Sequence, residues 1–293
     1  MKQLLLSVFL GAALGLAAPQ APAADAKVIN VQVIGSGKPV ILIPGLACNG
    51  TVWDDTVKHL QGKYQCHVVS IAGFGGTAPA KAENLIDTVR DEVIAYARAA
   101  KLEKPTLVGH SLGGTVALMI GQAAPELPGA IVSVDGLPFL AGVMFPGVKD
   151  VEGAKKGVSG MRDMMAKQAP EQFAQSQRTM VIPSMVTKPE DVQRIADMCA
   201  KSDPATVGQA MTELLSRDLR PELASIKCPI VVLGALAQFL QFAPREALEQ
   251  NYKTQFANAP QTRFHFFDKA KHFIMIDDPA GFYAVLDQQL AAK

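Results

Sequence analysis

The pentapeptide Gly109-His110-Ser111-Leu112-Gly113 constrains the fold of this 293-residue chain more than any other stretch. It follows Thr106-Leu107-Val108, which predicts a short buried strand, and it opens residues 112–124, whose apolar residues recur at helical spacing. In a G-x-S-x-G turn between a strand and a helix, the glycines permit a strained, closely packed backbone and the serine hydroxyl is held outward. We therefore interpret Ser111 as a nucleophile. The competing interpretation is an ordinary glycine-rich turn.

Strand-like and helix-like segments alternate on both sides of this turn. Short apolar runs predict buried strands, and longer amphipathic runs predict helices that cover them. The predicted strands are 39–43, 67–71, 106–108, 130–134, 229–233 and 262–267, and the main helices are 53–60, 84–100, 112–124 and 279–291. This order predicts an α/β fold with a mostly parallel central sheet flanked by helices. A further short strand at 27–33, with the Gly35-Ser36-Gly37 turn behind it, predicts a first hairpin.

The alternation stops after Asp135, and residues 139–224 contain helix-like segments without a convincing strand. We expect a helical cap over 139–224, inserted into a core made of residues 25–138 and 225–293. Methionines are frequent in this cap, which suits either an adaptable apolar pocket or the cap's own core.

The N-terminus has the pattern of a secretory signal peptide over residues 1–24. Lys2 precedes an apolar run from Leu4 to Ala18, and Ala21-Pro22-Ala23 forms an A-x-A-like cleavage site. The apolar run is short for a membrane span of about 20 residues. We expect a periplasmic or secreted protein without stable membrane insertion after cleavage. Cleavage would leave 27 basic and 27 acidic residues, a balance that argues against a nucleic-acid partner.

Four cysteines remain in the exported chain: Cys48, Cys66, Cys199 and Cys228. Export permits disulfides, and four thiols allow three complete pairings that the sequence does not rank. They are either buried small residues or members of one or two structural bridges. No C-x-x-C spacing is present, so we expect no metal site, and nothing in the chain implies an organic cofactor.

Four motifs together resemble the α/β-hydrolase superfamily over essentially the whole mature chain. They are Pro44-Gly45-Leu46 after an early strand, the Gly73-x-Gly75 loop, the serine turn, and a histidine beyond the last strand with Asp277-Asp278-Pro279 behind it. The inserted cap is similar to that of esterases, lactonases, aminopeptidases of the proline iminopeptidase type and haloalkane dehalogenases. A dehalogenase is disfavoured because Ser111 stands where that family uses aspartate.

The resemblance implies that His272, in the loop after the final strand, is the general base for Ser111. His59, His67 and His265 suit structural roles, and the side chain of His110, at the variable position of the serine turn, need not reach the reaction. Relatives commonly carry the acid after the strand that follows the cap, but residues 233–238 contain no carboxylate. Some relatives carry it at the end of the strand before the cap, which favours Asp135. Asp268 is the alternative, whereas Asp277 and Asp278 suit the start of the last helix.

The resemblance also implies an oxyanion hole made by backbone N–H groups of Leu112 and Leu46, with Ala47 as an alternative to Leu46. These residues predict a secreted serine hydrolase that cleaves a carboxylic ester or lactone, a small-molecule substrate, through a Ser-His-Asp catalytic triad and an acyl-enzyme. One alternative is an aminopeptidase or amidase of the proline iminopeptidase type, which needs cap carboxylates to hold an amine. Candidates for these are Glu171, Glu190 and Asp191. Another alternative is a non-catalytic ligand-binding module, and the oligomeric state stays open.

Overall fold

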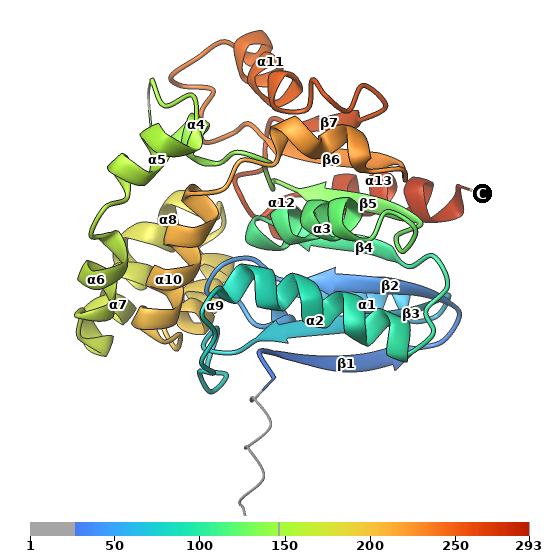
Figure 1. Cartoon of the computed structure of the whole chain (residues 1–293), viewed down its shortest axis with the longest axis horizontal. Coiled ribbons are helices and arrows are strands. Elements are labelled where there is room, and N and C mark those ends of the chain that lie inside the picture. Colours follow the sequence, from blue (N-terminus) through green and yellow to red (C-terminus); the bar gives the residue numbers. More distant parts are fainter. Residues whose placement is uncertain (1–26, 146, 293) are drawn as a thin grey trace, which may run out of the picture.

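A computed structural model describes residues 27–145 and 147–292 of the chain, so the expected signal peptide lies outside the described residues. Seven strands form one sheet in the order β1-β3-β2-β4-β5-β6-β7. The strands are β1 (Ile29–Gly35), β2 (Lys38–Ile43), β3 (Tyr64–Ile71), β4 (Thr106–His110), β5 (Ala130–Val134), β6 (Ile230–Ala235) and β7 (Arg263–Phe267). Among the strands of the described residues, only β1 runs antiparallel to its neighbour (Figure 1). The mostly parallel α/β sheet expected from the sequence is confirmed.

The first hairpin expected from the sequence is wrong. β1 pairs with β3, with Ile29 opposite Ile71, and is not hydrogen-bonded to β2. Both edges of β2 are already taken by parallel neighbours, β3 on one side and β4 on the other. The glycine turn at 35–37 therefore carries the chain from the sheet's outer edge to its interior.

Helices cover both faces of the sheet (Figure 1). On one face α2 (Leu85–Ala99) packs against α3 (Leu112–Ala123). On the other, α1 (Asp54–Leu60) meets α13 (Pro279–Ala291), because His59 hydrogen-bonds Asp287 and Trp53 stacks near Phe282. A helix that the sequence analysis missed, α11 (Arg245–Gln255), connects β6 to β7.

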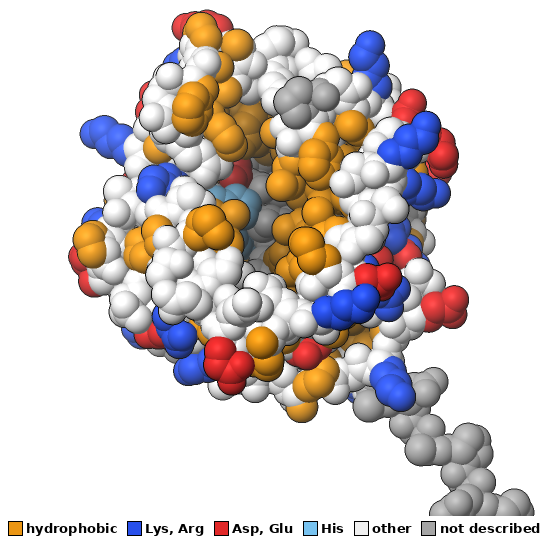
Figure 2. Space-filling view, turned by 90° about the vertical axis from the view of Figure 1, so that its left-hand side faces the viewer, with side chains coloured by type: hydrophobic (Ala, Val, Ile, Leu, Met, Phe, Trp, Pro, Cys, Tyr) orange, Lys and Arg blue, Asp and Glu red, His pale blue; other side chains and the backbone are white. Residues whose placement is uncertain are grey.

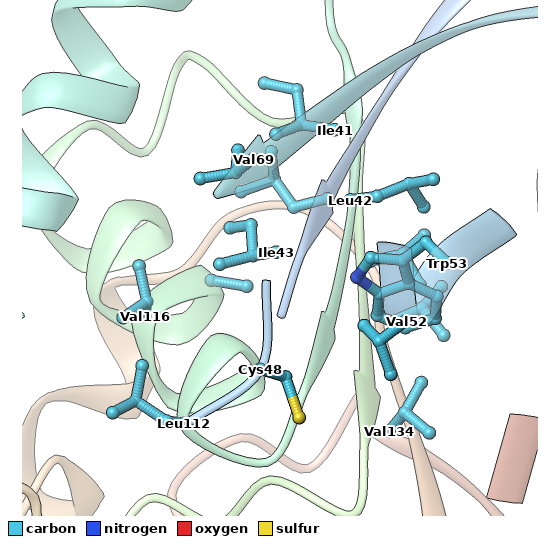
Figure 3. Close-up of a cluster of buried hydrophobic side chains, with 14 of the residues drawn as sticks. Ile41, Leu42, Ile43, Cys48, Val52, Trp53, Val69, Leu112, Val116 and Val134 are labelled. Atoms are coloured by element: carbon cyan, nitrogen blue, oxygen red, sulfur yellow. The ribbon is translucent and has the colours of Figure 1, made fainter. Parts of the chain in front are cut away.

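The core is centred on β2, whose last four residues are buried on both faces of the strand. Figure 3 shows Ile41, Leu42 and Ile43 surrounded by Val69 of β3 and Val116 of α3, and all five side chains are fully buried. Burying an aliphatic side chain of this size contributes about 1.5–3 kcal/mol to folding. The apolar runs that predicted central strands are thus explained by helices on both sides of the sheet.

A helical insertion, defined here as residues 136–229, connects β5 to β6. Its helices are α4 (Ala141–Met144), α5 (Val151–Gly157), α6 (Met161–Ala166), α7 (Pro170–Ser176), α8 (Ile182–Met185), α9 (Pro189–Cys199) and α10 (Pro204–Leu215). A π-helical turn, Gln177–Val181, precedes α8, and a 3-10 helix, Arg220–Ser225, follows α10.

Proline in the first turn sets where α7, α9 and α10 begin. These helices gather beyond the carboxyl ends of the parallel strands (Figure 1). The insertion's methionines range from buried to exposed. Met198 is buried in the core, Met165 and Met185 are half-buried against it, and Met164 and Met180 are each 67% exposed. Among residues 27–145 and 147–292, no helix combines the length and apolar character needed to cross a bilayer.

Candidate active site

Ser111 occupies a strained turn between β4 and α3. Its φ of 53° and ψ of −117° are unfavourable for a residue with a side chain, and such strain persists only where the surroundings hold it. The Ser111 N–H donates to Val134 O at 2.9 Å, and its carbonyl accepts from the N–H groups of Gly114 and Thr115. With the backbone held at both ends, the half-buried side chain stands at the carboxyl end of β4.

The two glycines of the pentapeptide are required by close backbone approach. A Cβ on Gly109 would lie 2.1 Å from the carbonyl oxygen of Gly113. A Cβ on Gly113 would lie 2.2 Å from the carbonyl oxygen of Ile43. These distances are far inside van der Waals contact, so the start of α3 rests directly on β2 and β4 only because both positions are glycine.

His272 lies in the loop between β7 and α12 (Ile274–Asp277), and its Nδ1 is 2.6 Å from Oδ2 of Asp135. The Asp135 side chain is only 6% exposed and that of His272 is 19% exposed. A buried carboxylate in contact with Nδ1 favours the tautomer in which Nδ1 carries a proton and Nε2 is free to accept one. The structure therefore brings together the histidine and the acid favoured from the sequence.

Three donors hold the Asp135 carboxylate in place. Beyond its contact with His272, its Oδ1 accepts the Ala235 N–H at 3.0 Å and the Tyr252 hydroxyl. Ala235 ends β6, so the carboxylate starts from β5 and reaches the end of the next strand. Asp135 itself has a φ of 52°, a left-handed conformation that aspartate tolerates better than most residues. This position supplies the carboxylate that residues 233–238 lack.

Tyr252 is a site residue that the sequence analysis missed. It lies in α11, and its ring packs edge-on against Phe266 of β7. Burial, followed by the negative charge of Asp135, raises the pKa of Tyr252 well above its ordinary value. The phenol therefore stays protonated and acts as a donor. No sequence pattern marks it, because it meets Asp135 across 117 residues of chain.

His110 contacts both the backbone and the ring of His272. It is buried, and its Nε2–H donates to the carbonyl oxygen of His272 at 3.0 Å while the two rings lie 4.7 Å apart. Burial, followed by repulsion from charge on His272, lowers the pKa of His110 well below its ordinary value. A neutral His110 ring therefore places no second positive charge beside the His272 imidazole. The sequence predicted only that the His110 side chain need not reach the reaction, and its hydrogen bond to His272 was not predicted.

The structure places the other candidate acids away from the His272 imidazole. Asp268 is 45% exposed and forms an ion pair with Arg245. Asp278 caps α13 by accepting the Gly281 N–H, as expected. The expectation that Asp277 belongs to the last helix is wrong. It ends α12 and accepts hydrogen bonds from the N–H groups of Thr187 and Lys271, because the chain turns once more before α13 begins.

The Gly45-Leu46-Ala47 turn lies against Ser111. A Cβ on Gly45 would be 3.2 Å from the Ser111 Cβ, so the turn and the serine are in direct contact. The Gly45 carbonyl accepts the Cys48 N–H at 3.1 Å, and in a trans peptide the Leu46 N–H points opposite to that carbonyl. Within the described ranges, the N–H groups of Leu46 and Leu112 have no acceptor. Two unpaired donors beside the nucleophile position can stabilise a developing oxyanion.

Residues 40–285 match the model of the alpha/beta hydrolase family. This chain belongs to that family. A pimeloyl-[acyl-carrier protein] methyl ester esterase of Aeromonas hydrophila is 27% identical over 270 residues, which cover 88% of this chain and 98% of the relative.

Two solved structures share the fold of this alpha/beta hydrolase at low sequence identity. A thermophilic esterase from Thermogutta terrifontis superposes with a TM-score of 0.72 at 20% identity, covering 89% of this chain and 92% of the other. An enol-lactonase from Burkholderia xenovorans superposes with a TM-score of 0.71 at 17% identity, covering 92% and 100%. The fold is therefore common to hydrolases of different substrates.

The surface of this alpha/beta hydrolase is hollowed at the edge where the helical insertion meets the sheet. Figure 2 shows apolar side chains on both walls of the hollow and a histidine at its floor. Of the three carboxylates considered for amine binding, Glu171 and Glu190 are exposed to solvent. Asp191 forms an ion pair with Arg194 at 3.0 Å. Nothing at these three carboxylates favours an aminopeptidase.

Proposed function

We propose that this alpha/beta hydrolase is a serine esterase that cleaves carboxylic esters, with Ser111 as nucleophile, His272 as general base and Asp135 as the acid that orients it. One observation carries the proposal. The buried Asp135–His272 hydrogen bond of 2.6 Å lies at the carboxyl ends of the parallel strands, where the strained Ser111 turn also lies. His110, the neighbour of Ser111, donates a hydrogen bond to the backbone carbonyl of His272.

In the first step the Ser111 Oγ attacks the ester carbonyl carbon while His272 Nε2 takes the hydroxyl proton. The carbonyl oxygen becomes an oxyanion that the N–H groups of Leu46 and Leu112 stabilise. The carbon–oxygen bond to the alcohol then breaks, and the alcohol leaves with the proton held by His272. An acyl-enzyme on Ser111 remains.

In the second step a water molecule gives a proton to His272 Nε2 and attacks the acyl carbon through the same oxyanion hole. Ser111 recovers the proton as the carboxylic acid departs. Throughout, Asp135 keeps the Nδ1 proton in place and stabilises the imidazolium. The neutral state of His110 matters here, because a second positive ring 4.7 Å away would oppose that imidazolium.

The hollow and the relatives support the proposed substrate class. The apolar walls in Figure 2 suit an uncharged acyl or alcohol group beside the reacting carbonyl. The named relative acts on a methyl ester, a carboxylic ester with a small leaving alcohol. A lactone is an internal ester, so the same two steps would open it.

A fluorophosphonate probe tests the reaction type, because it labels a serine only where a base activates the hydroxyl. We expect folded protein to be labelled on the peptide that contains Ser111, and Ser111→Ala to abolish both labelling and hydrolysis of p-nitrophenyl esters. Folded protein that takes up no label would refute the proposal. A parallel series of p-nitrophenyl esters, lactones and aminoacyl amides then ranks the leaving groups.

We also propose that the chain is exported and processed. The N-terminal pattern supports this, since an apolar run precedes the Ala21-Pro22-Ala23 cleavage site. N-terminal sequencing of the protein from its native cell should find a mature chain that starts at Ala24 or Asp25. Recovery of a chain that starts at Met1 would contradict export with processing.

A further inference from the structure

Two buried cysteines meet where the helical insertion joins the Gly45-Leu46-Ala47 turn. The Sγ atoms of Cys48 and Cys199 lie 3.7 Å apart, although 151 residues separate them in the chain. Cys48 directly follows the Gly45-Leu46-Ala47 turn, and Cys199 is the last residue of α9. Both are 1% exposed or less, and Figure 3 shows the Cys48 sulfur among the apolar side chains around β2.

The other two cysteines take no part in this contact. Cys66 lies within β3 and Cys228 lies just before β6, and in the described part of the chain neither sulfur contacts another. The structure therefore favours none of the three complete pairings that the sequence allows. It favours a single pair, Cys48 with Cys199.

We propose that Cys48 and Cys199 form a disulfide under oxidising conditions, while Cys66 and Cys228 remain thiols. A disulfide needs its sulfurs at about 2.0 Å, so both side chains must approach each other from their present 3.7 Å. The proposal goes beyond esterase activity and does not depend on it.

The oxidation is a thiol–disulfide exchange with a small-molecule or protein disulfide. One cysteine thiolate attacks the oxidant's sulfur, the oxidant's S–S bond breaks, and a mixed disulfide forms. The second cysteine then attacks this mixed disulfide, and the Cys48–Cys199 bond forms. The two thiol protons end on the two thiols of the reduced oxidant, so two electrons pass from the protein to the oxidant.

The junction that this bond would lock is already connected by hydrogen bonds. The Ser202 hydroxyl donates to Ala47 O at 2.9 Å and accepts the Gly75 N–H at 2.8 Å. The Asp203 N–H donates to Gly73 O at 2.8 Å. The end of α9 is thus positioned on the turn that contains Leu46, and a covalent bond there holds the insertion and the turn together.

The bond should be inert once formed and slow to form in the folded protein. The hydrogen bond with Cys199, followed by burial, raises the pKa of the Cys48 thiol well above its ordinary value. Since the thiolate is the attacking species, exchange needs a transient opening of the junction. Burial likewise raises the pKa of Cys66 and of Cys228 to about 11, which keeps both as thiols.

Peptide mapping tests the pairing directly, because trypsin places each cysteine on its own peptide: 28–58, 64–81, 195–201 and 228–245. The full chain is purified without reductant after export to a bacterial periplasm, denatured and alkylated with N-ethylmaleimide. We expect one linked species, 28–58 joined to 195–201, with Cys66 and Cys228 alkylated. Alkylated Cys48 and Cys199 in most molecules, or any other linkage, would overturn the proposal.

Thermal unfolding gives an independent measurement. Closing a loop of this length should raise the midpoint of unfolding by about 10 °C, so reductant should lower the wild-type midpoint by that amount. Cys199→Ala should show no dependence on reductant. The matched control, Cys228→Ala, should keep the wild-type dependence. A wild-type midpoint that reductant does not change would contradict the proposal.

Discussion

Replacing Asp135 with asparagine tests how the site orients His272. The amide oxygen can still accept from the Ala235 N–H and the Tyr252 hydroxyl, so the amide nitrogen takes the place of Oδ2 beside Nδ1. An NH₂ group only donates, so the histidine must carry its proton on Nε2, where it can no longer accept the serine proton. We expect kcat/KM to fall about 10⁴-fold, equal to about 5.5 kcal/mol of barrier.

The assay is hydrolysis of p-nitrophenyl acetate, with kcat and KM measured separately. The loss should lie in kcat, because the carboxylate does not contact the substrate's binding groups. Circular dichroism and the melting temperature verify that the variant is folded. The control is Asp268→Asn, whose side chain is 45% exposed and paired with Arg245, and which should retain near wild-type activity. The reasoning fails if Asp135→Asn keeps more than about a tenth of wild-type kcat/KM, or if the control loses as much.

Three further variants test neighbouring contacts. Tyr252→Phe removes one donor from the Asp135 carboxylate and should lower kcat/KM about tenfold; unchanged kinetics would show that the hydroxyl does not orient the acid. Buried His110 stays neutral in the folded protein, whereas the same residue binds a proton in the unfolded chain below about pH 6.5. The free energy of unfolding should therefore be retained above about pH 6.5 and fall below it, by up to about 1.4 kcal/mol per pH unit. Urea titrations between pH 7 and 5 should therefore give a shallower decline for His110→Gln, and equal slopes would contradict this. Gly113→Ala places a Cβ 2.2 Å from a backbone oxygen and should yield no soluble folded protein, whereas Gly62→Ala, with nothing within 4 Å, should fold normally in the same expression test.

The sequence alone determined the elements whose signals are local. Short apolar runs placed six of the strands within a few residues of their observed bounds, because burial acts on each segment's own pattern. The serine turn was equally local, since Gly109 and Gly113 are needed wherever a helix starts directly on a strand. The serine turn singled out Ser111. The resemblance to the α/β-hydrolase superfamily singled out His272, and it favoured Asp135 because residues 233–238 contain no carboxylate.

Contacts between distant segments needed the tertiary structure. β1 pairs with β3 because β2 is already paired on both edges, and no local pattern records which edge is free. Asp135 and Asp268 both stood as candidate acids until strand order brought one beside His272 and left the other exposed. Tyr252 has no signal of its own, because its role depends on a carboxylate 117 residues away.

The cysteines show the same division. Their number and the expected export were readable in the chain, and these allowed disulfides without ranking the pairs. Only the packing of α9 on the Gly45-Leu46-Ala47 turn brings Cys48 within 3.7 Å of Cys199. Local patterns specify which residues are buried. Which buried residues meet is decided by how the helices and strands pack, because that choice depends on the whole chain at once.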